Sequence, residues 1–125
     1  MIDYKNAKFV KLRKVEKNSY SKEVDQMLID NEIIIDAFKG IRDGIVITNK
    51  RIIVINIQGM TGKKKDLTSL PFSKIQSYSI ETIGVVDIES ELILWFSGIG
   101  AIRLEFTGAT NLYEISRAIS TVVLN

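Results

Sequence analysis

Residues 44–58 read GIVITNKRIIVINIQ, two apolar runs separated by the polar residues of TNKR. Isoleucine and valine are branched at Cβ, and such side chains favour the extended backbone of a β-strand. The separating residues have the length and the polar character of a hairpin loop. We therefore expect two antiparallel strands here, joined by a tight turn.

The same pattern continues on both sides of this hairpin. Short β-rich runs alternate with separators such as GIRDG, PFSK and SGIG, which contain typical turn residues. Because these separators are too short for crossover helices, the sheet that they predict is antiparallel. The seven expected strands are residues 33–39, 44–48, 51–58, 65–70, 74–83, 90–97 and 101–107.

Helical spacing appears before and after the strands. Residues 110–123 follow the last strand, with Thr110 as the expected N-cap and an apolar stripe made of Leu112, Ile115, Ile119 and Val122. Residues 19–28 precede the first strand, with Ser19 or Ser21 as the expected cap and an apolar side made of Tyr20, Val24, Met27 and Leu28. Both segments are predicted to be amphipathic helices.

The predicted fold class is mainly β with helices (α+β). Seven antiparallel strands would form a curled sheet closed by the C-terminal helix, which is the pleckstrin-homology (PH) architecture. Residues 1–22 carry seven basic and two acidic side chains, a net charge of +5, and a weak helical period predicts a helix over residues 3–18. We expect residues 1–32 to form a basic arm and helix, and residues 33–125 to form the PH-like domain.

The residue types that are missing exclude several functions. The chain has neither histidine nor cysteine, which rules out disulfides, Ser-His-Asp triads, Cys-His nucleophiles and tetrahedral zinc sites. It contains no apolar run of about 20 residues, the length of a membrane span, and no segment typical of a secretory leader. We expect a cytoplasmic protein that is not an enzyme and that uses no cofactor or metal.

Residues 41–82 (IRDGIVITNKRIIVINIQGMTGKKKDLTSLPFSKIQSYSIET) resemble the bacterial PH-like domain family. The family pattern of IRD, TNKR, QG-TGKK and a leucine-proline step into an Ile- and Ser-rich strand is matched in order. The resemblance extends from about Ile33 to the C-terminal helix and weakly into residues 20–32, and nothing is carried over to the basic arm. It implies the PH-like fold and ring-like homo-oligomers, with a pentamer as the best guess. It implies no catalytic residues.

The stretch GMTGKKK (residues 59–65) invites comparison with a nucleotide P-loop, which needs four residues between its glycines and a helix after them. Here two residues separate the glycines and a strand follows, so we interpret the stretch as a hairpin turn. The alternative is contact with an anionic lipid or an acidic partner. The candidate residues for such a contact are Lys63, Lys64 and Lys65, together with Lys50 and Arg51 of the TNKR turn, where exposed charge is expected in any case.

Other polar patterns carry weaker functional interpretations. KGIRDGIVI (residues 39–47) lacks aromatic residues on which RNA bases could stack, so we expect no nucleic-acid partner. The loop within it offers only Arg42 to a lipid headgroup. Asp87, Glu89 and Glu91 alternate and would share one face of a strand. A solvated face is their expected role, and a metal or acid–base site is the alternative.

Three of the expected strands are apolar on both faces: residues 45–47, 52–55 and 92–96. Exposing such surface costs about 25 cal/mol per Å². The two helices, neighbouring subunits or both must therefore cover it. We expect a non-enzymatic, self-assembling interaction module whose partners are its own copies, as a pentameric ring, and an unknown protein. The alternative is a peripheral membrane module that contacts anionic lipid through the basic arm and the lysine loop.

Overall fold

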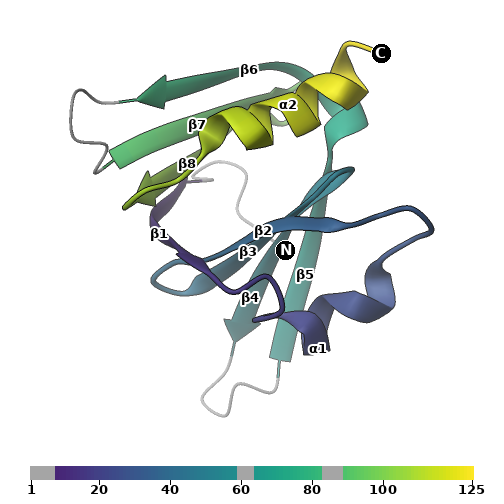
Figure 1. The fold of residues 1–125 in the computed structure, drawn as a ribbon, viewed down its shortest axis with the longest axis vertical. Helices are drawn as coiled ribbons and strands as arrows, with labels where there is room; N and C mark the ends of the chain where they lie inside the picture. Colours follow the sequence, from purple (N-terminus) through teal and green to yellow (C-terminus); the bar gives the residue numbers. More distant parts are fainter. Residues whose placement is uncertain (1–7, 59–63, 83–88) are drawn as a thin grey trace.

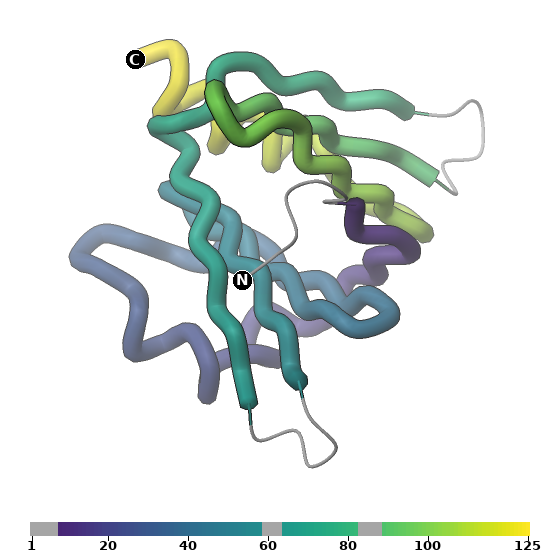
Figure 2. The backbone as a smooth tube through the Cα atoms, turned by 180° about the vertical axis from the view of Figure 1, so that it is seen from behind, coloured from purple at the N-terminus to yellow at the C-terminus, as the bar shows by residue number. Residues whose placement is uncertain are grey.

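The computed structural model describes residues 8–58, 64–82 and 89–125. Within these ranges eight strands form one sheet (Figure 1): β1 (Lys8–Val15), β2 (Ile34–Lys39), β3 (Asp43–Thr48), β4 (Arg51–Gln58), β5 (Lys64–Pro71), β6 (Ile75–Thr82), β7 (Glu89–Phe96) and β8 (Gly100–Thr107). Their order is β5-β4-β3-β2-β1-β8-β7-β6, so β5 and β6 are the edges. Figure 2 shows how β5 leads through the short helix η3 (Phe72–Lys74) into β6.

The PH-like α+β fold class is confirmed, and each of the seven expected strands lies within one residue of its predicted bounds. Two details of the prediction are wrong. The described chain has an eighth strand, β1, in an open sheet. The sheet is also not fully antiparallel, because β1 pairs antiparallel with β2 but parallel with β8.

The expected helix over residues 3–18 is wrong where the chain is described, because residues 8–15 form β1. A β-bulge explains the error. The register of β1 against β8 shifts between Phe9 and Leu12, and Lys11 within the bulge has a φ of 54°. Phe9 and Leu12 therefore both face the core, 8% and 0% exposed, although they are three residues apart. The bulge thus removes the two-residue alternation by which a strand is recognised in a sequence.

The main core lies between the two halves of the sheet, β1–β5 and β6–β8. The helix α2 (Leu112–Val123) packs against β6 and η3 and closes one end (Figure 1). Its predicted apolar stripe is confirmed: Leu112, Ile115 and Ile119 are buried, and Val122 packs against the same core. The expected cap is wrong by one position, because the side chain of Asn111 accepts a hydrogen bond from the Glu114 amide at 3.3 Å.

A second, smaller layer covers the outer face of β2–β4. The expected helix over residues 19–28 is confirmed in shorter form, as α1 (Ser21–Val24) followed by the 3₁₀ turn η2 (Asp25–Met27), and neither serine caps it through its side chain. Val24 packs with Ala37, Val46, Ile53 and Ile55, and Tyr20, Met27 and Leu28 lie beside them. Residues 45–47 and 52–55, apolar on both faces, are thus covered within one chain. No helix in the described ranges is long and apolar enough to cross a membrane.

Candidate functional site

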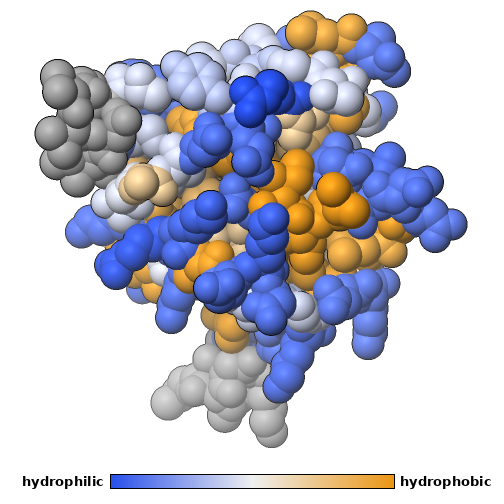
Figure 3. Space-filling model, in the orientation of Figure 1, coloured by the Kyte–Doolittle hydropathy of each residue, from blue (hydrophilic) through white to orange (hydrophobic). Residues whose placement is uncertain are grey.

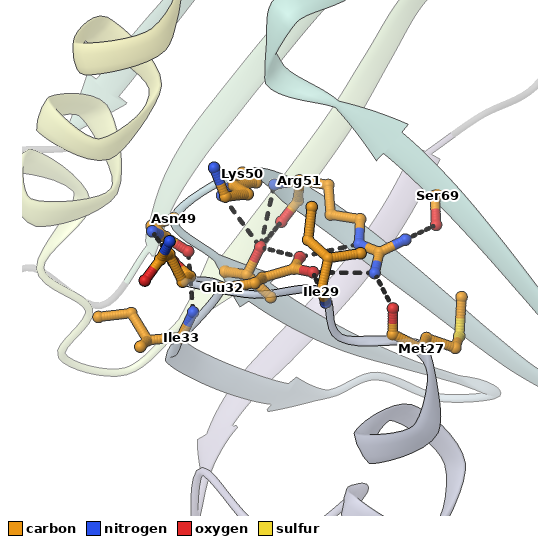
Figure 4. Close-up of polar contacts among 10 residues, drawn as sticks. Met27, Ile29, Glu32, Ile33, Asn49, Lys50, Arg51 and Ser69 are labelled. Atoms are coloured by element: carbon orange, nitrogen blue, oxygen red, sulfur yellow. Dashed lines mark hydrogen bonds and ion pairs between the residues drawn. The ribbon is translucent and has the colours of Figure 1, made fainter.

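Arg51 is the first residue of β4, and its guanidinium group turns back under the loop between η2 and β2, residues 28–33 (Figure 4). Its Nε donates to Oε2 of Glu32 at 2.8 Å, and its Nη2 donates to Oε1 at 3.0 Å, which makes the pair bidentate. Further hydrogen bonds reach the carbonyl of Met27 at 2.7 Å and Oγ of Ser69 at 3.0 Å. The side chains of Arg51 and Glu32 are 18% and 0% exposed.

Thr48 connects this ion pair to the β3–β4 turn. Its hydroxyl donates to Oε2 of Glu32 at 2.7 Å and accepts from the backbone amides of Lys50 and Arg51, both at 3.0 Å. Burial raises the pKa of Glu32, but hydrogen bonds from Arg51, the Ile29 amide and Thr48 outweigh it and hold the pKa below its usual value. The carboxylate is therefore charged and fully occupied at neutral pH.

Asn49 fixes the other side of the same loop. Its Nδ2 donates to the carbonyl of Asn31 at 2.9 Å, its Oδ1 accepts from the amide of Ile33 at 2.9 Å, and its amide donates to the Ile33 carbonyl at 3.1 Å. Asn31 adopts a φ of 66°, a left-handed conformation that asparagine tolerates better than most residues. Side chains of the TNKR turn thus hold this loop through Met27, directly before it, and through Asn31, Glu32 and Ile33 at its end.

This fixed loop exposes two apolar side chains, Ile29 at 62% and Ile33 at 64% (Figure 4). Apolar surface also gathers on the face shown in Figure 3, to the right of centre, below α2 and beside the start of β2. A loop that is rigid, hydrogen-bonded and apolar on its outside has the properties of a preformed contact surface for another protein. We call this loop, residues 28–33 with the exposed side chains of Ile29 and Ile33, the isoleucine loop.

The five basic candidates from the sequence do not form one surface where they are described. The β4–β5 register pairs Arg51 with Pro71 and Gln58 with Lys64, so the TNKR turn and the described lysines, Lys64 and Lys65, lie at opposite ends of β4. An eight-residue strand separates such ends by roughly 23 Å at about 3.3 Å per residue. One small anion cannot contact both groups.

The candidates also differ in their bonding. Lys50 and Lys64 are exposed, as expected. The expectation of exposed charge is wrong for Arg51, because Glu32 occupies its guanidinium. Lys65 forms an ion pair with Glu23 of α1 at 3.3 Å and stays 43% exposed. Lys63 lies outside the described residues, and anion binding by any of the five stays a prediction.

The acidic candidates are divided in the same way. Asp87 lies outside the described residues, whereas Glu89 and Glu91 belong to β7. Within the described ranges, no three acidic side chains are grouped closely enough to hold a metal ion. Arg42 is exposed at the β2–β3 turn, next to an aspartate that accepts a hydrogen bond from Asn56.

Glu32 is the member of this site that sequence reasoning missed. It stands after Asp30 and Asn31 in a polar run that reads as the end of a helix. Its partner Arg51 is 19 residues further along, and only the folded chain brings the two together. A local sequence pattern carries no signal for such a pair.

Comparison with known proteins identifies the family. The family model for the bacterial PH domain matches residues 4–123, nearly the whole chain. The chain belongs to the bacterial PH domain family. The match includes the residues of β1, although the sequence resemblance began only near residue 20.

This bacterial PH domain is similar to two proteins of Bacillus subtilis described as uncharacterised. It is 38% identical to YjqA over 104 residues, covering 82% of this chain and 83% of YjqA. It is 31% identical to YozO over 106 residues, covering 85% of this chain and 91% of YozO.

Solved structures show the same fold. A pleckstrin-homology domain protein from Shewanella loihica superposes with a TM-score of 0.72 at 34% identity, covering 90% of this chain and 97% of the other. A pleckstrin-homology domain from Shewanella amazonensis gives a TM-score of 0.61 at 36% identity, covering 89% and 90%.

Proposed function

We propose that this bacterial PH domain is a non-enzymatic interaction module that assembles with copies of itself. The observation that carries the proposal is the isoleucine loop, which exposes Ile29 and Ile33 by 62% and 64% on a backbone fixed by Asn49 and Glu32. Burying apolar surface gains about 25 cal/mol per Å². A loop that is already ordered loses little conformational entropy when it binds.

The assembly proposed is a closed ring of identical subunits in the cytoplasm, with a pentamer as the family-based guess and a further, unknown protein as its partner. A ring repeats one head-to-tail interface, in which the isoleucine loop of each subunit would pack against a complementary surface of the next subunit. The outer face of β2–β4 is already covered by α1 and η2. Ile29 and Ile33, in the loop that follows this layer, stay exposed and are available to a neighbouring subunit.

Native mass spectrometry at micromolar concentration tests the proposal. We expect a single oligomer for the native chain and monomers for the double variant Ile29→Asp, Ile33→Asp. Leu124→Asp is the matched control, because Leu124 is 75% exposed at the end of the chain and outside the loop. A native chain that is monomeric and binds no hydrophobic dye would refute self-assembly. An oligomer that survives the double variant would refute the role of the loop.

The alternative function, contact with an anionic membrane, gains support from a different feature. At the β2–β3 turn, Ile41 is 69% exposed beside Arg42 and two residues from Lys39, which stands directly opposite Arg13 of β1. An apolar tip among basic side chains suits a lipid surface with negative charge. Co-sedimentation with anionic and neutral liposomes tests it. Binding that is lost in Arg13→Glu, Lys39→Glu supports it, and equal binding to neutral liposomes contradicts it.

A further inference from the structure

The two edges of the sheet differ in how they are protected against pairing with another strand. The edge strand β5 carries Lys64, Lys65 and Asp66 at one end and Pro71 at the other. Such residues are the usual devices that prevent edge pairing. The edge strand β6 (IQSYSIET) has no lysine and no proline over its eight residues, and its first charge is Glu81. Figures 1 and 2 show β6 at the rim of the sheet, and its only partner strand in the described chain is β7.

The register of the three strands β6–β8 places glutamates side by side on their outer face. Glu81 stands directly opposite Glu91, and Glu91 stands directly opposite Glu105. Like charges directly opposite each other destabilise a sheet. Two members of this glutamate row are compensated, because Glu91 pairs with Arg103 at 3.4 Å and Glu105 pairs with Lys8 at 2.9 Å.

Glu81 is the member at the open edge, and it is the one without an ion pair in the described part of the chain. Glu81 is exposed, and no described strand pairs with β6 on the side away from β7. A further strand would place one outward side chain there, about 5 Å from Glu81. A lysine or arginine at that position would complete the compensation of the row.

The inner side of β6 sets a second requirement. Tyr78 and Ile80 are half-buried and pack against the main core, whereas Ser77 and Ser79 point to the outer face. A strand added to β6 would lay alternate side chains beside Tyr78 and Ile80, which favours apolar residues there. Its other side chains would lie opposite Ser77, Ser79 and Glu81.

We propose that β6 binds an extended, basic segment of a partner protein by strand addition. The main chain of the segment pairs with the open edge, its apolar residues lie beside Tyr78 and Ile80, and its basic residue faces Glu81. Recognition by this mode takes affinity from main-chain hydrogen bonds and specificity from the alternate side chains. The inference does not depend on self-assembly, because the isoleucine loop and β6 belong to different elements.

The probe is a capped eight-residue peptide of alternating lysine and valine, with an alternating glutamate and valine peptide as its counterpart. Trp95 of β7 is the single tryptophan of the chain. It stands opposite Ser77 of β6 and is 47% exposed, so its fluorescence reports binding at β6. We expect the lysine peptide to bind and the glutamate peptide not to bind. In Glu81→Lys we expect roughly tenfold weaker binding of the lysine peptide and detectable binding of the glutamate peptide.

Two controls separate strand addition from simple charge attraction. Glu16→Lys makes the same charge change at an exposed position outside the strands and should leave the affinity unchanged. A lysine peptide methylated on alternate backbone nitrogens keeps its charge but loses main-chain donors, so it should bind at least tenfold more weakly. The proposal would be overturned if the methylated and unmethylated lysine peptides bound with equal affinity. It would also be overturned if Glu81→Lys and Glu16→Lys changed the affinity for the lysine peptide equally. If Glu81→Lys alone changed the oligomeric state, the edge would belong to a second copy and the proposal would fail.

Discussion

Replacing Glu32 by glutamine tests whether the buried ion pair under the isoleucine loop stabilises the fold. The carboxylate of Glu32 accepts four hydrogen bonds: two from Arg51, one from Thr48 and one from the Ile29 amide. A glutamine side chain places an NH2 group against at least one of these donors and leaves the Arg51 guanidinium without a counter-charge. Removing one partner of a buried pair costs about 3–5 kcal/mol. Because Arg51 remains 18% exposed, we expect about 3 kcal/mol, the lower end of that range.

Urea denaturation at several pH values measures this loss. Burial alone would raise the pKa of Glu32, but hydrogen bonds from Arg51, the Ile29 amide and Thr48 outweigh it and lower the pKa in the folded chain from its ordinary value of 4.5. Its stabilisation is therefore fully present above pH 4.5 and disappears as the pH falls through the folded pKa. The difference in unfolding free energy between native protein and variant should be largest at pH 7 and shrink below pH 4.5. Glu16→Gln, at an exposed position, should show no such difference. A loss below about 1 kcal/mol at pH 7, or a loss that does not change with pH, would refute the reasoning.

Three further predictions concern the core, a close contact of Gly44 and a surface ion pair. Ile119→Ala should lower the unfolding free energy by about 2–5 kcal/mol, because Ile119 is fully buried. Ser116→Ala, at a flanking position of the same helix, should change it little. Equal shifts in melting temperature for the two variants would contradict the helix register. Gly44→Ala should lower the unfolding free energy by about 1–3 kcal/mol, because the new Cβ would lie 2.6 Å from Cε1 of Tyr20. Adding Tyr20→Ala to the same chain should recover part of that loss, as measured by chemical denaturation. Lys65→Ala should cost less than about 1 kcal/mol, since its ion pair with α1 is exposed, and a larger loss on thermal melting would show that the pair anchors α1.

The strands were predictable because their signal is local. Runs such as residues 44–48 and 51–58 contain branched apolar residues bounded by turn residues, and both properties can be read within a few positions. The apolar stripe of α2 is equally local. β1 was mispredicted because its bulge at Lys11 breaks the two-residue alternation, and the sequence does not mark the bulge.

The candidate site was less predictable because it depends on distant contacts. The sequence indicated a polar turn at Arg51, but the side chain that neutralises it arrives from residue 32 through a loop whose path is set by packing. The glutamate row needs the registers of three strands at once, and a shift of one residue in any of them would move a glutamate to the other face. Registers follow from the whole sheet, which no short pattern encodes.

The position of β1 in the middle of the sheet has a consequence for synthesis of the chain. β1 pairs with β2, which follows within about 25 residues, and with β8, which ends at Thr107. While a ribosome makes residues 16–99, the half formed by β1–β5 can assemble, but the β8 side of β1 has no partner. Contacts of such long sequence separation form late and slow folding. Chains released before residue 100 would therefore present β1 as an unpaired edge, so premature termination should yield aggregates rather than a soluble half-domain.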